Sequence, residues 1–187
     1  MPISFLLRKI LNKLRGKTPA QAEMEYLCSQ GLIIGSNFRN HSDYAVDALL
    51  PWLISIGDDV CLSTDVKILA HDTSTEYING HTKIGTVTIG NRVYVGCGSI
   101  ILCNVHIGDD VIIGAGSVVT HDVPSNSVYA GNPAHFICTL QEFKAKHMGQ
   151  LDKVPVFDGP VSKWHTSTSE EKLAMREILK DSFGYMK

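Results

Sequence analysis

Six aliphatic residues recur at intervals of six in the middle of this 187-residue chain. They are Ile89, Val95, Ile101, Ile107, Ile113 and Val119. The residue four positions after each of them is small or β-branched, and this second series is Val93, Ser99, Val105, Val111, Ser117 and Val123. A period of six fits neither an amphipathic helix nor simple strand alternation. It is typical of a parallel β-helix, in which each hexapeptide forms one short strand and one corner.

Glycine follows the aliphatic residue in four of these repeats, at Gly90, Gly96, Gly108 and Gly114. Glycine allows corner conformations that a side chain would forbid. The same spacing occurs upstream at Ile56, Leu62 and Ile68, with Val60 and Val66 in the second series. We therefore expect an all-β solenoid domain over residues 32–138, with both series of side chains turned into its core.

The upstream and downstream repeats are out of step, because the interval from Ile68 to Ile89 is not a multiple of six. An insertion in a solenoid is pushed out as a loop, often on the binding face. The sequence therefore predicts one loop at about 71–86. A second loop or irregular turn is expected at about 40–53, where the repeat is broken again.

Composition limits the classes of partner. The formal net charge of −2 gives no support to nucleic-acid binding, which usually requires a basic surface. The five cysteines form no CxxC pair and are odd in number, which favours reduced thiols in a cytoplasmic protein. No segment reads as a membrane span or as a cleavable signal peptide.

Residues 1–31 are expected to form a helical segment. Residues 1–17 have apolar side chains at helical spacing and basic side chains on the other face. This pattern suits either a helix packed on the solenoid or an interfacial helix on an anionic membrane, and both interpretations stay open. A second helix is predicted from Thr18 as N-cap and Pro19 to Gln30, followed by Gly31.

Residues 139–187 are expected to form a C-terminal helical extension. One helix is predicted from Thr139 to His147 and a connecting segment from Gly149 to Trp164. A capping-box pattern at Ser167–Glu170 predicts the start of a last helix that runs to about Ser182.

Four stretches give the chain a family resemblance: Trp52–Gly57, Ile68–Asp72, Ile107–Asp122 and Ala130–Ala134. With the repeat, they make the chain resemble the hexapeptide-repeat acyltransferases. The similarity is greatest to the maltose and galactoside O-acetyltransferase branch and its relatives that acetylate polysaccharides. It covers roughly residues 35–137, and it implies a left-handed parallel β-helix.

The resemblance also implies chemistry. Members of this family transfer acetyl from acetyl-CoA directly to a hydroxyl, without an acyl-enzyme, which makes a sugar or glycan precursor the expected acceptor. An alcohol needs a general base as it attacks a thioester, and histidine suits that task at neutral pH. His71 matches the family's catalytic histidine.

Other site residues follow from the same resemblance. The backbone N–H of Cys97 matches the donor that stabilises the oxyanion. Asp47 and Trp52 match the acceptor-binding region, although Asp47 could equally be an aspartate that caps a loop.

The residues implied for CoA binding are Gly96, Cys97, Gly114, Ala115, Thr120, His121 and His135. Relatives commonly have Lys or Arg in place of the two histidines. Histidine is only partly charged at neutral pH, so we expect CoA affinity to rise as pH falls toward about 6.

The resemblance implies a homotrimer whose active site uses two subunits, acetyl-CoA as co-substrate, and neither a resident cofactor nor a metal. Three alternatives remain at this stage. The acceptor could be another small hydroxyl compound of the serine or antibiotic type. The chain could be a β-helical zinc enzyme with ligands among His71, His81, His106 and His121, or a scaffold without catalysis.

Overall fold

The computed structural model describes residues 19–41, 45–159 and 161–187. The chain divides into two compact units, one ending at Leu140 and the other comprising Gln141–Lys187. The N-terminal segment 1–17, for which two interpretations were open, lies outside the described residues.

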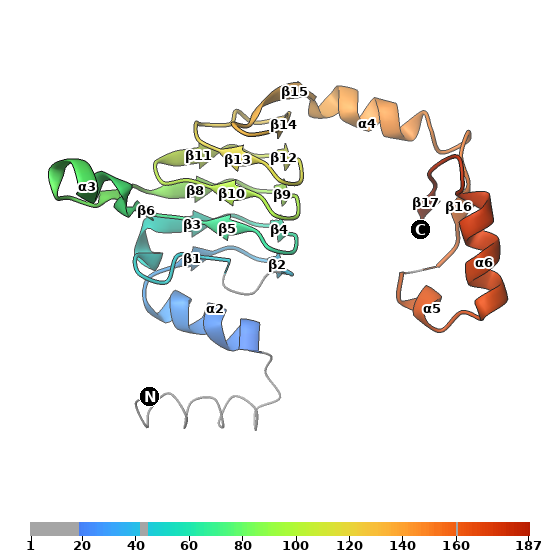
Figure 1. Cartoon of the computed structure of the whole chain (residues 1–187), viewed down its shortest axis with the longest axis horizontal. Coiled ribbons are helices and arrows are strands. Elements are labelled where there is room, and N and C mark those ends of the chain that lie inside the picture. Colours follow the sequence, from blue (N-terminus) through green and yellow to red (C-terminus); the bar gives the residue numbers. More distant parts are fainter. Residues whose placement is uncertain (1–18, 42–44, 160) are drawn as a thin grey trace. The chain divides into compact units, whose positions relative to one another are not determined.

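The first unit is a coil whose strands build three sheets (Figure 1). Sheet A contains β1 (Ile33–Ile34), β3 (Ile54–Ile56), β8 (Val87–Ile89) and β11 (Val105–Ile107). Sheet B contains β2 (Arg39–Asn40), β4 (Cys61–Leu62), β9 (Tyr94–Val95), β12 (Ile112–Ile113), β14 (Ser127–Ala130) and β15 (His135–Thr139). Sheet C contains β5 (Lys67–Ile68), β10 (Ile100–Ile101) and β13 (Val118–Val119).

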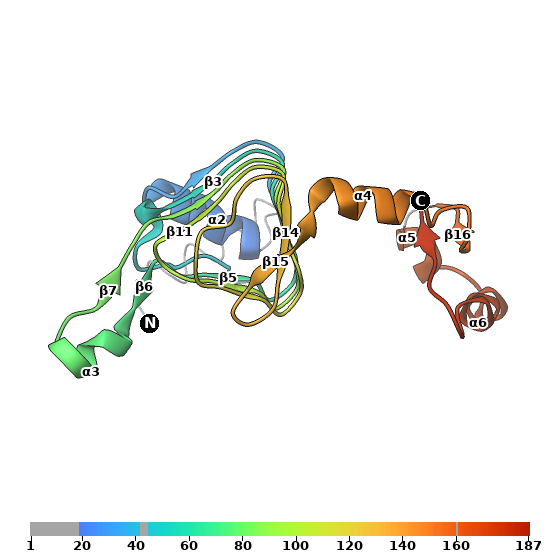
Figure 2. The ribbon, with the colours of Figure 1, turned by 90° about the horizontal axis from the view of Figure 1, so that it is seen from above.

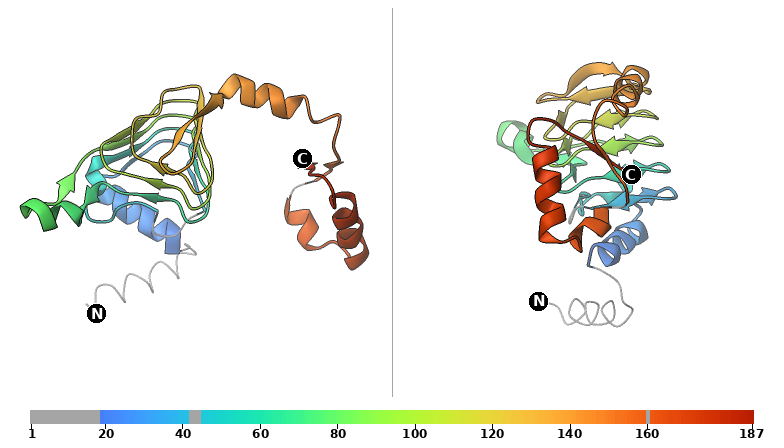
Figure 3. Two further views of the ribbon diagram at one scale, coloured as in Figure 1. Left: turned by 45° about the horizontal axis from the view of Figure 1, so that its top comes forward. Right: turned by 90° about the vertical axis from the view of Figure 1, so that its right-hand side faces the viewer.

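The chain visits the sheets in the order A, B, C and returns to A, which gives the triangular outline in Figures 2 and 3. We call the A-to-B, B-to-C and C-to-A connections the first, second and third corners. Pairing within the sheets is parallel, except that β15 runs antiparallel to β14. Ile89 pairs with Ile107, the aliphatic residue three repeats later, so three hexapeptides make one turn of the coil. The parallel solenoid predicted from the six-residue period is confirmed.

Both series of repeat residues face the interior. All twelve side chains from Ile89 to Val123 are buried, with exposed fractions of 2% or less. Residues that flank them on the same strands, such as Ile100 and Tyr94, are less buried and face outward. Alternation along a strand turns every second side chain to the other face, which is why the aliphatic positions build the core.

The first corner repeats one hydrogen-bond arrangement in successive coils. The second residue after each strand uses its backbone N–H to donate to a side chain of the next coil: Asp58 to Asn91 Oδ1, Asn91 to Asp109 Oδ1, and Asp109 to Ser125 Oγ. The residue that follows has positive φ, as at Asp59 (57°) and Asp110 (58°), a conformation that Asn and Asp tolerate better than most residues. Polar side chains therefore accept the backbone N–H groups of the first corner.

The helix predicted at the N-terminal side is α2 (Pro19–Ser29), which ends two residues before Gly31 with φ of 103°. Leu27 of α2 is 1% exposed and belongs to the core. A Cβ at Gly31 would lie 2.8 Å from Cβ of Trp52, so glycine is required there both for its φ and for close packing. The expected N-cap, Thr18, lies outside the described residues.

The insertion predicted at 71–86 is a short hairpin arm. It comprises β6 (His71–Asp72), η2 (Thr73–Thr75), α3 (Glu76–Asn79) and β7 (Lys83–Ile84). β6 and β7 pair antiparallel, with His71 opposite Ile84 and Asp72 opposite Lys83. The coil that carries the arm is longer than a regular one, and the arm supplies the additional chain between β5 and β8. It leaves the coil at the third corner.

The irregular segment at 40–53 contains η1 (Pro51–Leu53) and a single parallel bridge between Val46 and Ile68. This bridge places residues 45–47 beside sheet C, although they form no named strand. The pairing of Val46 with Ile68 spans more chain than the pairing of Ile89 with Ile107, so this coil is also longer than a regular one.

The second unit contains four short elements after α4 (Leu140–Met148): β16 (Val156–Phe157), α5 (Val161–His165), α6 (Ser169–Ile178) and β17 (Tyr185–Met186). β16 and β17 pair in parallel, so the predicted connecting segment 149–164 carries structure of its own. Among the described residues, no helix is long and apolar enough to cross a bilayer.

Two details of the last helix differ from the sequence prediction. The capping box joins Thr168 and Glu171, one residue later than predicted, because Thr168 has the extended N-cap backbone and Glu171 accepts from its N–H. The helix also ends at Ile178 rather than near Ser182. Beyond it, Lys180 and Ser182 donate to residues three positions earlier, forming turns that precede Gly184.

Candidate functional site

His71 lies at the third corner, where the chain leaves sheet C for the hairpin arm. It follows β5 by three residues and begins β6. Its side chain is 23% exposed and contacts the carboxylate of Asp47, whose side chain is only 2% exposed. A hydrogen bond joins His71 Nδ1 to Asp47 Oδ2. One ring nitrogen of His71 is therefore anchored in the protein.

Asp47 is held by backbone as well as by His71. Its Oδ1 accepts from the N–H of Leu49 at 3.0 Å, and its Oδ2 accepts from the N–H of Ala70 at 3.0 Å. Burial alone would raise the pKa of Asp47, but the hydrogen bond from His71, together with those from Leu49 and Ala70, outweighs burial and lowers the pKa below its ordinary value. Asp47 is therefore an ionised carboxylate with fixed geometry.

The ionised partner fixes the tautomer of His71. A carboxylate can only accept hydrogen bonds, so Nδ1 of His71 must carry a proton. In the neutral imidazole Nε2 is then unprotonated and can accept a proton from a substrate. A carboxylate that orients a histidine in this way also stabilises the imidazolium that forms when the ring accepts a proton.

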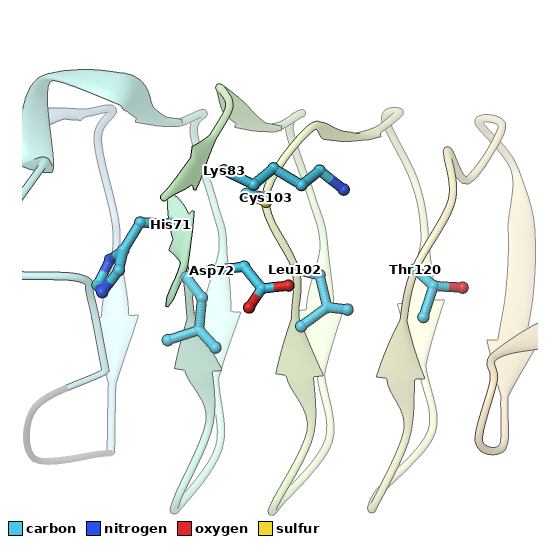
Figure 4. Close-up of a pocket in the computed structure, with 7 residues that line it drawn as sticks. His71, Asp72, Lys83, Leu102, Cys103 and Thr120 are labelled. Carbon is cyan, nitrogen blue, oxygen red and sulfur yellow. The ribbon is translucent and has the colours of Figure 1, made fainter. Parts of the chain in front are cut away.

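A pocket of about 220 Å³ adjoins His71 (Figure 4). Its lining residues are Leu69, His71, Asp72, Lys83, Leu102, Cys103 and Thr120. Leu69, Leu102 and Thr120 occupy equivalent places after successive strands of sheet C, while Asp72 and Lys83 come from the hairpin arm. The third corner thus combines a positioned histidine, a cation, an anion and an apolar floor.

The two residues expected to bind the acceptor have different surroundings. Asp47 is buried against His71, with both carboxylate oxygens accepting hydrogen bonds within the chain. Trp52 is 57% exposed on η1 and is not among the residues that line the pocket. The pairing of Asp47 with His71 was missed from the sequence. A sequence signal for this pairing does exist. Ile34 pairs with Ile56 of the next coil, and Val46 precedes Ile68 by the same interval, which places Asp47 beside the residues just after Ile68.

Four of the residues implied for binding the acetyl donor, CoA, lie at the second corner. Gly96, Cys97, Gly114 and Ala115 follow β9 and β12, and these two coils stack closely. A Cβ on Gly96 would lie 2.4 Å from the backbone nitrogen of Ala115, so only glycine fits between them. Cys97 is exposed.

The backbone N–H of Cys97 differs from its counterparts at the first corner. Asn91, at the same place in its hexapeptide, donates its N–H to an aspartate of the next coil. Within ranges 19–41, 45–159 and 161–187, no acceptor receives the N–H of Cys97. This donor remains available to a ligand.

The other expected CoA contacts are divided between corners. Thr120 and His121 follow β13 at the third corner, and a hydrogen bond of 2.7 Å joins Thr120 Oγ1 to His121 Nδ1. His135 is exposed on β15, with Nδ1 3.3 Å from the carbonyl oxygen of Pro133. The structure thus brings Thr120 to the pocket of His71 but places Cys97 and His135 elsewhere on the same chain.

A zinc site has no support in the described part of the chain. No group of three or more His, Cys, Asp or Glu side chains there is arranged to hold a metal ion. The Nδ1 atom of His71 is hydrogen-bonded to Asp47.

The repeat and its surroundings match known proteins. The model of the family described as "Bacterial transferase hexapeptide (six repeats)" matches residues 86–121. Protein CapG of Staphylococcus aureus is 37% identical over 155 residues, a match that covers 78% of this chain and 86% of CapG. This chain belongs to the hexapeptide-repeat acyltransferases. Membership implies the left-handed coiling predicted from the resemblance.

Two further relatives of the hexapeptide-repeat acyltransferase have named activities. Galactoside O-acetyltransferase of Escherichia coli (strain K12) is 35% identical over 117 residues, which cover 61% of this chain but only 56% of the relative. A solved structure of a maltose O-acetyltransferase from Clostridium difficile 630 superposes with a TM-score of 0.52 at 30% identity, covering 71% of this chain and 84% of that one.

Proposed function

We propose that this hexapeptide-repeat acyltransferase is an acetyl-CoA-dependent O-acetyltransferase that acts on a hydroxyl of a sugar or glycan precursor in the cytoplasm. The single observation that carries the proposal is the Asp47–His71 pair at the edge of the pocket. Two relatives with named activities, the galactoside and maltose O-acetyltransferases, support the choice of donor and acceptor class. A solved structure of galactoside acetyltransferase in complex with coenzyme A shares the fold, with a TM-score of 0.52.

In the proposed reaction, Nε2 of His71 accepts the proton of the acceptor hydroxyl while the oxygen attacks the thioester carbonyl. Asp47 keeps Nδ1 protonated and stabilises the imidazolium, so we assign it a positioning role in place of the acceptor contact expected from the sequence. The tetrahedral intermediate collapses with cleavage of the carbon–sulfur bond. The CoA thiolate leaves and takes the proton back from His71, which restores the neutral ring.

The oxyanion of the intermediate requires donors that are already in place. The donor we propose is the N–H of Cys97, which no acceptor in the described ranges receives. It lies at the second corner, whereas His71 lies at the third corner of the preceding coil, so the two groups of one chain lie at different edges of the solenoid. A homotrimer in which the second corner of one subunit meets the third corner of the next would bring them together.

The same arrangement accounts for the division of the expected CoA contacts. Gly96, Cys97, Gly114 and Ala115 would come from one subunit, and Thr120 with His121 from its neighbour. We propose that the pantetheine arm lies in the groove between these corners, where the glycines allow close approach to the backbone. His135 completes the proposed set at the phosphate end.

The test combines binding with turnover. We expect excess acetyl-CoA, but not ATP, to raise the unfolding temperature, because a ligand at about a hundred times its Kd stabilises a folded protein by roughly 2.7 kcal/mol. Acetyl transfer is then measured on a panel of sugars, with serine included as a different hydroxyl acceptor. His71→Ala should retain the thermal shift and the trimer but lose turnover by at least about a hundredfold. Near-normal turnover of His71→Ala would refute the mechanism.

A further inference from the structure

The two sides of the hairpin arm carry different residues at its base. His71 pairs with Ile84, and Asp72 pairs with Lys83. Paired residues of an antiparallel ladder lie on the same side of it, and successive residues along each strand alternate between the two sides. Lys83 and Asp72 therefore project from the opposite side of the arm to the ring of His71.

The side chain of Lys83 extends along the third corner. Figure 4 shows it passing over Cys103 toward Thr120, away from the carboxylate of Asp72. Strands β5, β10 and β13 are neighbours in that order in sheet C, so this direction leads from the coil that carries the arm toward the C-terminal coils. It brings the ammonium group toward Thr120 and His121, the two residues at this corner that are implied for CoA binding.

No carboxylate in the described ranges lies within ion-pair distance of the Lys83 ammonium group. The ion pairs found there involve His71, Arg92 and Lys180. Asp72, opposite Lys83 in the ladder, accepts the N–H of Ser74 at 2.9 Å and caps η2. Because Lys83 is exposed, its three N–H donors are accessible to a ligand that lies along this corner.

The spacing of the coils indicates which part of CoA reaches this position. Neighbouring strands lie about 4.8 Å apart, so β13 with Thr120, two strands beyond β5, is roughly 10 Å from the level of the arm. In the proposed reaction the thioester lies beside His71. The pantetheine arm joins the thioester sulfur to the first phosphate through about as many bonds as four peptide residues, a reach of at most roughly 14 Å. The first phosphate of CoA therefore lies at the level of Thr120 or one coil beyond it.

The phosphates also require positive charge. The residues implied at the phosphate end are His121 and His135, and histidine is only partly charged at neutral pH. Lysine is charged throughout that range and binds phosphate as a compact charge with three donors. Resting on the proposed function, we propose that Lys83 of the hairpin arm binds the pyrophosphate of CoA, at the phosphate next to the pantetheine arm.

The experiment measures the binding of CoA fragments to the full-length protein. Isothermal titration calorimetry gives the Kd of CoA, dephospho-CoA, 4′-phosphopantetheine and pantetheine. The first three contain the phosphate next to the pantetheine arm, dephospho-CoA lacks only the 3′-phosphate, and pantetheine contains no phosphate. Lys83→Met should raise the Kd of the first three by a similar factor of about five to ten, the strength of a charge-assisted contact that remains partly solvated. The Kd of pantetheine should not change.

Two further variants show whether the effect comes from the charge at this position. Lys83→Arg should retain most of the affinity for CoA, because it keeps the positive charge. Lys153→Met removes an exposed lysine of the second unit and is the matched control, with the Kd of wild type expected. The difference between wild type and Lys83→Met should also shrink as salt is added, because salt screens exposed charges.

The outcomes separate the two proposals. An unchanged Kd for CoA in Lys83→Met would overturn the role of Lys83. So would an effect that disappears with dephospho-CoA, which would place the contact at the 3′-phosphate, or one that persists with pantetheine, which would place it on the pantetheine arm. Each of these results leaves the acetyltransferase proposal standing. If wild-type protein binds none of the four ligands and acetylates no acceptor, the proposed function itself is overturned.

Discussion

Replacing Asp47 by asparagine tests how the site works, because the change keeps size and shape but removes the charge. The carboxylate receives three donors: the N–H of Leu49 on Oδ1, and both the N–H of Ala70 and Nδ1 of His71 on Oδ2. An amide offers one accepting oxygen and one NH₂ group. In either orientation, its NH₂ faces a backbone N–H that then has no acceptor.

The magnitude follows from that count. A buried donor left unpaired costs about 1–3 kcal/mol, so Asp47→Asn should lower the free energy of unfolding by roughly 2 kcal/mol. If the amide oxygen faces Ala70 and His71, the histidine keeps its tautomer. If it faces Leu49, the NH₂ donates to Nδ1 and the ring proton moves to Nε2. His71 can then no longer take the proton from the substrate hydroxyl. In either orientation the neutral amide no longer stabilises the imidazolium, so we expect kcat to fall by a factor of about 10² to 10⁴.

The pH dependence has a definite sign. The pKa of Asp47 is lowered in the folded protein, so its contribution to stability is present above the ordinary aspartate value of about 3.9 and is lost as pH falls through the lowered value. The difference in unfolding free energy between wild type and Asp47→Asn should be constant near neutral pH and should shrink below about pH 4.

Urea denaturation followed by circular dichroism, at matched protein concentration, measures the stability, and steady-state kinetics with the best acceptor measures kcat. Asp109→Asn is the control, since its carboxylate also accepts a backbone N–H, from Asn91, but at the first corner away from His71. If Asp47→Asn matched Asp109→Asn in kcat and kept the urea midpoint of wild type, the positioning role of Asp47 would be refuted.

Two further predictions concern the coil itself. Gly96→Ala should destabilise the protein by about 3 kcal/mol, because the new Cβ would meet backbone atoms of Ala115 and Gly114 within 2.8 Å. Gly98→Ala, which places its Cβ in open space at a φ of 69°, should cost only about 1 kcal/mol. Equal urea midpoints for the two variants would contradict the close stacking of the coils. Ile101→Ala should cost about 2–5 kcal/mol because the side chain is fully buried, while Ile100→Ala on the outward face of the same strand should cost less than about 1 kcal/mol, and the reverse order would place the core on the wrong face.

The core was predictable because its signal is local. A side chain at a fixed place in each hexapeptide faces the same way in every coil, so spacing alone identified the buried positions from Ile56 to Val123. The position of the insertion followed from the same rule, since a change of register between Ile68 and Ile89 requires extra chain. The helix at Pro19–Ser29 was marked by proline at its start and glycine beyond its end.

The site was less accessible to sequence reasoning because it depends on register between coils. Asp47 and His71 are far apart in the sequence, and their contact arises only because Val46 lies beside Ile68 of the next coil. Local periodicity does not set that register where the repeat is broken. The Asp72–Lys83 pairing likewise depends on how the hairpin arm closes.

The hairpin arm has a consequence for how such chains diversify. It lengthens a single coil at one corner, yet the strands before and after it pair as neighbours in all three sheets. Changes in its length or composition therefore leave the stacked coils untouched. A lineage can therefore exchange the part of the arm beyond His71 while inheriting that histidine and its aspartate unchanged.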